Sequence, residues 1–244
     1  MNESTSRHIL GTFEAALTSL RTNALMMAGL TQRNLQNSSS GLIKRETESC
    51  KMAIADDEEI DTLEVLIDRD GIDTMMRFNP VASDMREVLA TMKLSVHLER
   101  IADQSVGIAR RAIKLNTVPA VPEVTLIHEM LNHSIRMFQD ALQAFTDRNV
   151  ELALTLKPRD RQLDQMNKDV AEKLTDAMPE NVSRVRTYLD LIFIARYIER
   201  LGDHSANIAE DTVFLVSALD IRHQTAGTQK SAAAYGDIPI AKHL

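Results

Sequence analysis

The stretch Glu99-Arg100-Ile101-Ala102-Asp103 recurs later in the chain as Glu199-Arg200-Leu201-Gly202-Asp203. Both acids are displaced by the same interval, because 199 − 99 and 203 − 103 each equal 100. A four-residue spacing places Glu99 and Asp103 on one face of an α-helix, about one turn apart. The stretch therefore predicts a helix that carries paired carboxylates and is used twice.

A second pair of acids with the same internal spacing precedes each copy of this stretch. Asp57 and Asp61 precede the first copy, and Asp160 and Asp164 precede the second. Their offset is also constant, since 160 − 57 and 164 − 61 both equal 103. Identities at the offset of 100 include Arg86/Arg186, Leu89/Leu189, Ser105/Ser205, Ile108/Ile208 and Ala109/Ala209. Matches at a constant offset indicate an internal repeat, so we expect two similar halves.

The composition is typical of an all-α protein. The 244 residues include 8 glycines, 6 prolines and no tryptophan, and the 44% of hydrophobic residues can fill a core. A net charge of −7 disfavours nucleic acid as a partner. The single cysteine, Cys50, excludes an intramolecular disulfide framework, and we expect it to be a small buried residue.

Several features of the chain favour a cytoplasmic location. The single cysteine suits a reducing compartment. The N-terminal residues are polar, as a secretion signal would not be. No window has the roughly 18–20 apolar residues that a membrane span requires.

Hydrophobic periodicity and helix breakers predict six helices. We expect Asp70-Gly71 to end the second helix, Asn79-Pro80 to start the third, Pro179 to open the sixth, and Pro158 to kink or divide the fifth. The serine-rich residues 37–41 indicate a loop by local composition, whereas the repeat places the first turn at 44–46. We follow the repeat, with the loop as the alternative. The expected helices span about 8–43, 47–69, 79–115, 123–146, 150–178 and 179–219.

Three helices joined by short turns are antiparallel neighbours, so each copy predicts a three-helix bundle. The expected fold class is all-α, with two tandem antiparallel three-helix bundles related by the internal repeat. We place the first bundle at 7–116 and the second at 123–221. A proline-containing linker at 117–122 separates them, and a flexible C-terminal tail follows at 222–244.

The acid pairs of each bundle can converge, because its second and third helices lie side by side. Four carboxylates on one patch repel one another, so they either spread out in water or share a cation. Oxygen ligands suit Mg²⁺, Mn²⁺, Ca²⁺ or iron. The predicted metal ligands are Asp57, Asp61, Glu99 and Asp103 in one bundle and Asp160, Asp164, Glu199 and Asp203 in the other. A solvated acidic stripe without metal is the alternative.

Three residues beside these acids carry separate expectations. Arg100 and Arg200 directly follow the acids, so they point off the acidic face, and we expect each to pair with another helix. His204 follows Asp203, and we expect a surface histidine there.

Signs of catalysis are few. The sequence contains no glycine-rich phosphate loop and no spaced nucleophile–histidine constellation. No glutamate is followed by histidine three residues later, which argues against a carboxylate-bridged di-iron oxidase. Two alternatives stay open, a metal-dependent enzyme that uses the same carboxylates and a metal-free helical scaffold.

The chain resembles the PhoU family of phosphate transport accessory proteins. The resemblance rests on the segment 56–61 and on the repeated stretches 99–103 and 199–204, and it covers about residues 7–219. It implies metal at the eight acids named above. Pro158 departs from the family's pattern just before the second Asp pair, so we expect any distortion to fall on the second cluster.

The same resemblance implies a regulator and not an enzyme. Its expected role is that of an adaptor between the ATPase of the phosphate ABC transporter and a membrane sensor histidine kinase. Such a protein restrains phosphate uptake and starvation signalling when phosphate is plentiful. The resemblance further implies a cytoplasmic protein that forms a homodimer and reaches the membrane only through its partners.

Overall fold

The computed structural model describes residues 3–222, with side chains from residue 11 onward. Within residues 3–222 the regular structure is entirely helical, so the expected all-α class is confirmed. The predicted tail lies outside the described residues except for Arg222. The elements are α1 (Glu3–Ile43), α2 (Thr47–Phe78), α3 (Ala82–Leu115), α4 (Val124–Thr146), α5 (Val150–Leu154), α6 (Leu156–Ala177), the 3₁₀ turn η1 (Val182–Arg184) and α7 (Val185–Ser217).

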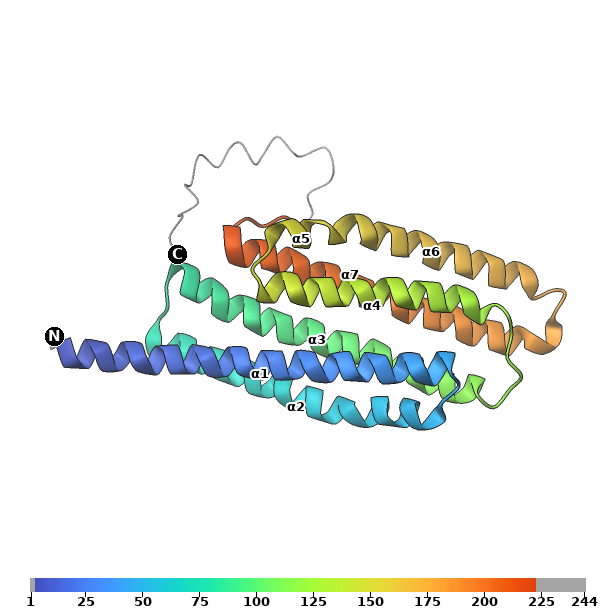
Figure 1. The fold of residues 1–244 in the computed structure, drawn as a ribbon, viewed down its shortest axis with the longest axis horizontal. Helices are drawn as coiled ribbons and strands as arrows, with labels where there is room; N and C mark the ends of the chain where they lie inside the picture. Colours follow the sequence, from blue (N-terminus) through green and yellow to red (C-terminus); the bar gives the residue numbers. More distant parts are fainter. Residues whose placement is uncertain (1–2, 223–244) are drawn as a thin grey trace, which may run out of the picture.

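The helices form the two expected three-helix bundles. Helices α1–α3 make one and α4–α7 make the other, and Figure 1 shows them side by side along the long axis. The bundles join where α3 packs against α7. Arg111 donates to Asp190 toward one end of this contact, and Lys93 donates to Asp211 toward the other. The two helices therefore run antiparallel.

This arrangement relates the bundles by an approximate two-fold axis. Helix α7 repeats α3 at an offset of 100 residues and runs against it, so the axis crosses α3 near Ile101 and α7 near Leu201. Contacts close to the axis fit this placement, since the rings of His97 and His204 lie 5.7 Å apart. Each position along α3 consequently has an equivalent position along α7.

The first turn lies where the repeat predicts it. Helix α1 continues through the serine-rich residues 37–41 and ends at Ile43, because Ser38 is buried and donates to the Leu35 carbonyl within the helix. Arg45 adopts a left-handed conformation with φ of 60°. Its guanidinium donates at 3.1 Å to the Leu115 carbonyl, which ties the turn to the end of α3.

The expected end of α2 at Asp70-Gly71 is wrong, because the helix continues to Phe78. Gly71 serves packing instead, since a Cβ there would lie 2.5 Å from the Met92 sulfur on α3. Asn79 forms the left-handed cap of α2. Its φ is 46°, and its backbone N–H donates a hydrogen bond to the Met75 carbonyl. A residue before proline avoids the right-handed helical region, so Asn79 ends α2 instead of starting α3. The expected start of the third helix at Asn79-Pro80 is therefore also wrong, since α3 begins at Ala82.

Pro158 divides the fifth predicted helix, as expected. Helix α5 ends at Leu154 and α6 begins at Leu156, which places Pro158 in the first turn of α6, where a missing N–H costs nothing. The expected start of the sixth helix at Pro179 is wrong. Asn181 donates its side-chain amide to the Ala177 carbonyl and accepts from the Arg184 N–H, which holds a turn there until α7 begins at Val185.

The core runs along the length of both bundles. Its largest fully buried side chains include Leu20, Ile60, Ile101 and Tyr188. Each such side chain contributes roughly 1.5–3 kcal/mol on burial. Cys50 is fully buried as expected.

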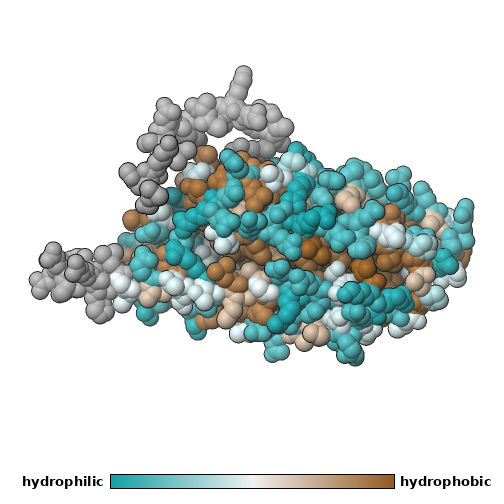
Figure 2. Space-filling view, viewed as in Figure 1, coloured by the Kyte–Doolittle hydropathy of each residue, from teal (hydrophilic) through white to brown (hydrophobic). Residues whose placement is uncertain are grey.

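The outer surface of the face in Figure 2 is mostly hydrophilic, with hydrophobic side chains gathered along the seams between helices. Among the described residues, no helix has the length and apolar content to cross a bilayer.

Candidate metal centre

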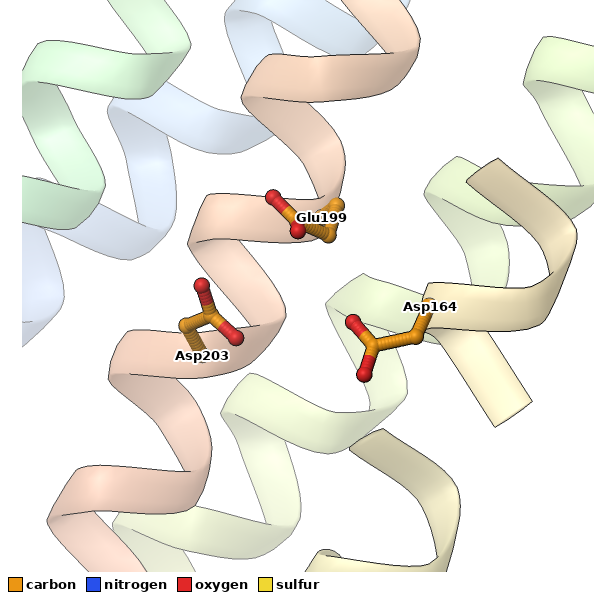
Figure 3. A group of neighbouring side chains, drawn as sticks. All are labelled: Asp164, Glu199 and Asp203. Atoms are coloured by element: carbon orange, nitrogen blue, oxygen red, sulfur yellow. The ribbon is translucent and has the colours of Figure 1, made fainter. Parts of the chain in front are cut away.

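Three acids of the second bundle converge between α6 and α7. One carboxylate oxygen from each of Asp164, Glu199 and Asp203 lies within 4.8 Å of the others. Figure 3 shows Asp164 reaching from α6 toward the other two, which project from successive turns of α7. Gly202 permits this approach, because a Cβ there would lie 2.3 Å from Cδ2 of Leu163 on α6. The close packing of the two helices thus sets the spacing of the acids.

Asp160, one turn before Asp164 on α6, joins this group as its fourth member. Burial raises the pKa of its carboxyl to about 7, and the neighbouring charges of Asp203 and Asp164 raise it further in the same direction. Its Oδ1 is buried and accepts no hydrogen bond from any described residue. Asp160 therefore carries an acceptor oxygen that residues 3–222 leave unsatisfied.

The negative charge of the Glu199 carboxylate is only partly compensated. Its Oε1 accepts a 2.7 Å hydrogen bond from Arg196 one turn earlier on α7. Its Oε2 is buried and has no hydrogen-bond donor within the described part of the chain. Burial raises the pKa of Glu199, and the charge of Asp203 adds to the effect despite Arg196. The four predicted acids of this bundle thus form one group with excess negative charge.

The first bundle brings its acids together more loosely. Burial is the main cause that raises the pKa of Glu99 to about 7, and the charge of Asp103 is the second. Burial also raises the pKa of Asp57, with Asp61 and Asp103 contributing. These couplings place the acids of α2 beside those of α3, as the repeat predicts. Among the acids, histidines and cysteine of the described chain, the second-bundle trio is the only group of three or more whose ligand atoms all lie within 4.8 Å of one another.

Arg100 contacts two acids of the first cluster, whereas Arg196 contacts only one acid of the second. The Nε of Arg100 lies 3.2 Å from Glu99 Oε2, and its Nη1 lies 3.8 Å from Asp103 Oδ2. The expectation that Arg100 pairs with another helix is therefore wrong, because its long side chain folds back onto its own acids. Arg200 does not form the expected ion pair either, as far as the described residues show. The first cluster is thus partly neutralised from within.

Glu64 is a member of the first cluster that sequence reasoning missed. Burial raises its pKa, and the charges of Asp68, Asp61 and Asp103 contribute, while Arg100 opposes them. Glu64 follows Asp61 by three residues, so helical periodicity alone could have placed it on the same face. The repeat did not reveal it, because the position 103 residues later is Asn167.

His204 is not the surface histidine that we expected. Burial lowers its pKa to about 4, and its Nδ1 is buried without a hydrogen-bond partner among the described residues. Its ring faces His97 on α3. The reason is that α7 packs on α3, so the residue after Asp203 lies in the contact between the two bundles.

The donor set fits a hard cation. Unpartnered buried oxygens and raised carboxyl pKa values indicate negative charge that the arginines of the described residues only partly balance. Carboxylate oxygens bind Mg²⁺, Mn²⁺ or Ca²⁺ at about 2.0–2.6 Å, which puts neighbouring ligand oxygens a few ångströms apart. Pro158 does not distort the second cluster, contrary to expectation, because it sits in the first turn of α6 before the acids.

The fold and the acidic face together define a class of all-α proteins: a duplicated three-helix bundle with acid pairs on the second and third helices of each copy. The sequence profile of the PhoU domain matches residues 25–112 and again 127–212. The chain therefore belongs to the PhoU family.

Relatives resemble the chain over nearly its whole length. The phosphate-specific transport system accessory protein PhoU homolog of Pseudomonas putida is 32% identical and aligns over 95% of this chain and 93% of its own. The PhoU protein of Escherichia coli K12 is 30% identical, with coverage of 89% and 90%.

A solved structure agrees. The crystal structure of PhoU from Pseudomonas aeruginosa superposes with a TM-score of 0.82 at 30% identity, covering 85% of this chain and all of that one. The tandem architecture is thus shared along with the sequence.

Proposed function

We propose that this chain is an accessory protein of phosphate transport that acts as a regulator. In this role it contacts the ATPase of the phosphate ABC transporter and a membrane sensor histidine kinase, and it restrains both when phosphate is plentiful. The observation that carries the proposal is the match of both PhoU domains, together with near-complete coverage of relatives named as transport accessory proteins.

Deletion of the gene tests this role. We expect phosphate-starvation genes to be expressed in phosphate-rich medium, and the intact gene to restore repression. Unchanged expression in the deletion strain would contradict the proposal. Purified transporter ATPase and the cytoplasmic part of the kinase should each bind the purified chain in a direct binding assay.

We also propose that both acidic clusters bind metal. The support is the pair of unpartnered buried oxygens on Asp160 and Glu199 and the raised carboxyl pKa values at both clusters. Elemental analysis of protein purified without chelator or added metal should find a divalent or trivalent ion with a preference for oxygen ligands. Apoprotein that fails to bind Mg²⁺, Mn²⁺, Ca²⁺ or iron in calorimetric titrations would contradict this proposal.

The proposed regulator works in the cytoplasm as a homodimer and reaches the membrane only through its partners. The support is its similarity to accessory proteins of a transport system. Cell fractionation and sedimentation of the purified chain test these two points. A metal-dependent enzyme would show turnover that disappears in the Asp203→Asn variant, and we expect none.

A further inference from the structure

The approximate two-fold axis gives the seam between α3 and α7 two equivalent ends. Positions 93, 96 and 97 of α3 with 207, 210 and 211 of α7 make one end. Positions 193, 196 and 197 of α7 with 107, 110 and 111 of α3 make the other. The residues at these equivalent positions differ in charge and size, so the two ends differ in chemistry.

At the first end the charges are balanced and the seam is hollow. Asp211 accepts a 2.8 Å hydrogen bond from Lys93 and lies 3.3 Å from His97 Nε2, and Glu210 accepts from Lys157. A cavity of about 310 Å³ lies among these side chains. The charged side chains at this end therefore pair with one another.

The other end, which we call the arginine end, comprises Arg110, Arg111, Leu189, Phe193 and Arg196. Here the seam is filled. Tyr197 occupies the space over Gly107, where a Cβ would lie 2.9 Å from the tyrosine ring. The arginine end consequently offers an outward surface instead of a cavity.

Arg111 builds this surface. Its guanidinium lies 4.0 Å from the centroid of the Phe193 ring and donates a 2.5 Å hydrogen bond to Asp190. The Phe193 side chain nevertheless stays 48% exposed, and Leu189, one turn earlier on α7, is 44% exposed. Two large apolar side chains on one helical face are thus exposed beside the three arginines of this end.

Arg110 and Arg196 border the surface on opposite sides. Both are exposed. Arg196 pairs with Glu199 of the second cluster, and Arg110 is the cation that opposes the raised pKa of Asp57 in the first cluster. Their equivalents at the other end are Glu210 and Val96, so only this end concentrates positive charge. Cations on the two clusters would leave these arginines with unbalanced charge.

We propose that the arginine end docks an acidic segment of a partner protein. Carboxylates of that segment would bind Arg110 and Arg196, and an apolar side chain would pack on Phe193 and Leu189. Guanidinium groups bind carboxylates through paired charge-assisted hydrogen bonds, and arginine with exposed aromatic residues is typical of protein interfaces. The inference rests on the proposed function, since a regulator of a transporter and a kinase must bind proteins.

The test uses the full chain loaded with Mn²⁺, with the transporter ATPase and the cytoplasmic part of the sensor kinase as probes. We expect Arg110→Glu and Phe193→Ser each to weaken binding of at least one probe by about tenfold or more, equivalent to about 1.4 kcal/mol. Arg136→Glu, an exposed arginine on α4, and Val182→Ser, an exposed apolar residue before α7, are matched controls that should bind normally.

The stabilisation of each variant by Mn²⁺ is measured alongside binding. Weakened binding with normal Mn²⁺ stabilisation supports the docking surface. Loss of both would assign the effect to the metal clusters and overturn the inference, as would normal binding by both variants. A wild-type chain that binds neither probe would overturn the proposed function together with this inference, whereas normal binding by the variants overturns the inference alone.

Discussion

Gly202 on α7 and Leu163 on α6 are in such close contact that a Cβ at position 202 would lie 2.3 Å from Leu163 Cδ2. Leu163 is fully buried, so it has little room to move. The equivalent residue in the first bundle is Ala102, and the acids there are less tightly assembled. The glycine therefore sets the distance between Asp164 and the acids of α7.

We expect Gly202→Val to push α6 away from α7 and to lower the free energy of unfolding by about 1–3 kcal/mol through overpacking. Metal affinity at the second cluster should fall as well, because Asp164 withdraws from Glu199 and Asp203. Thermal unfolding and calorimetric titration with Mn²⁺ measure the two effects. Gly29→Val is the control, since Gly29 has no neighbour within 4 Å of an added Cβ. Equal losses in both variants would contradict the packing argument.

The raised carboxyl pKa values predict how the metal-free protein responds to pH. Asp160 and Glu99 have folded pKa values of about 7, above their ordinary values of 3.8 and 4.5. Their contribution to stability is complete below the ordinary values and is lost as pH rises through about 7. The melting temperature of chelator-treated protein should therefore fall from pH 5 to pH 8, and Mn²⁺ should restore it most at pH 8.

Asp160→Asn separates this effect from general pH sensitivity. The neutral amide removes the buried charge, so we expect the chelated variant to lose less stability between pH 5 and pH 8 than the unmodified chain. It should also gain less from Mn²⁺. Asp169→Asn, on the same helix away from the cluster, should keep the full pH response. A steeper fall in Asp160→Asn than in the control would contradict the assignment.

The two clusters should differ in metal affinity. Arg100 contacts two acids of the first cluster and Arg196 only one of the second, and the trio Asp164, Glu199 and Asp203 is already assembled. We expect calorimetric titration to show a tighter event that Asp203→Asn weakens by at least about tenfold, a difference of about 1.4 kcal/mol. Asp103→Asn should change only the weaker event.

Arg100→Ala tests the cause of this difference. Removing the guanidinium leaves Glu99 and Asp103 without their internal counter-ion, so the weaker event should become tighter. The tighter event should not change. A weaker first-cluster event in Arg100→Ala would show that the arginine assists the metal and does not compete with it.

Most of the correct predictions from the sequence rested on the internal repeat. Constant offsets placed the acids on the correct helices and overruled the loop at 37–41, where the chain is helical because Ser38 is bonded inside α1. Helix ends were harder to predict, because Gly71 resembles a cap in sequence but serves the packing of α2 on Met92. That role depends on a partner helix which local sequence does not contain.

Side-chain orientation between the bundles could not be predicted either. The sequence predicted a surface position for His204 and no role for Arg111, and only the antiparallel packing of α3 on α7 brings them to His97 and Asp190. Glu64 escaped for the opposite reason, since it lies on the expected face but breaks the repeat. Comparison of the two copies finds the residues that both contain and misses a residue that only one contains.

Asp211 predicts a second pH response, of opposite sign. The side chain is buried, and burial disfavours its charge, but hydrogen bonds from His97 and Lys93 outweigh this and lower its pKa. A lowered folded pKa gives stability that is present above the ordinary value of 3.8 and is lost as pH falls through the folded value. The contact between bundles should therefore weaken in acid.

We expect Asp211→Asn to reduce the free energy of unfolding at pH 7 by about 1–3 kcal/mol, because Lys93 and His97 lose a charged acceptor at a buried site. The variant should also lose stability less steeply below pH 4 than the unmodified chain, since the group that titrates there is gone. Denaturant unfolding at pH 7 and at pH 3.5 measures both changes. Glu151→Gln, an exposed acid on α5, should behave like the unmodified chain at both pH values. If Asp211→Asn is as stable as that control at pH 7, the Lys93–Asp211–His97 contact does not hold the bundles together.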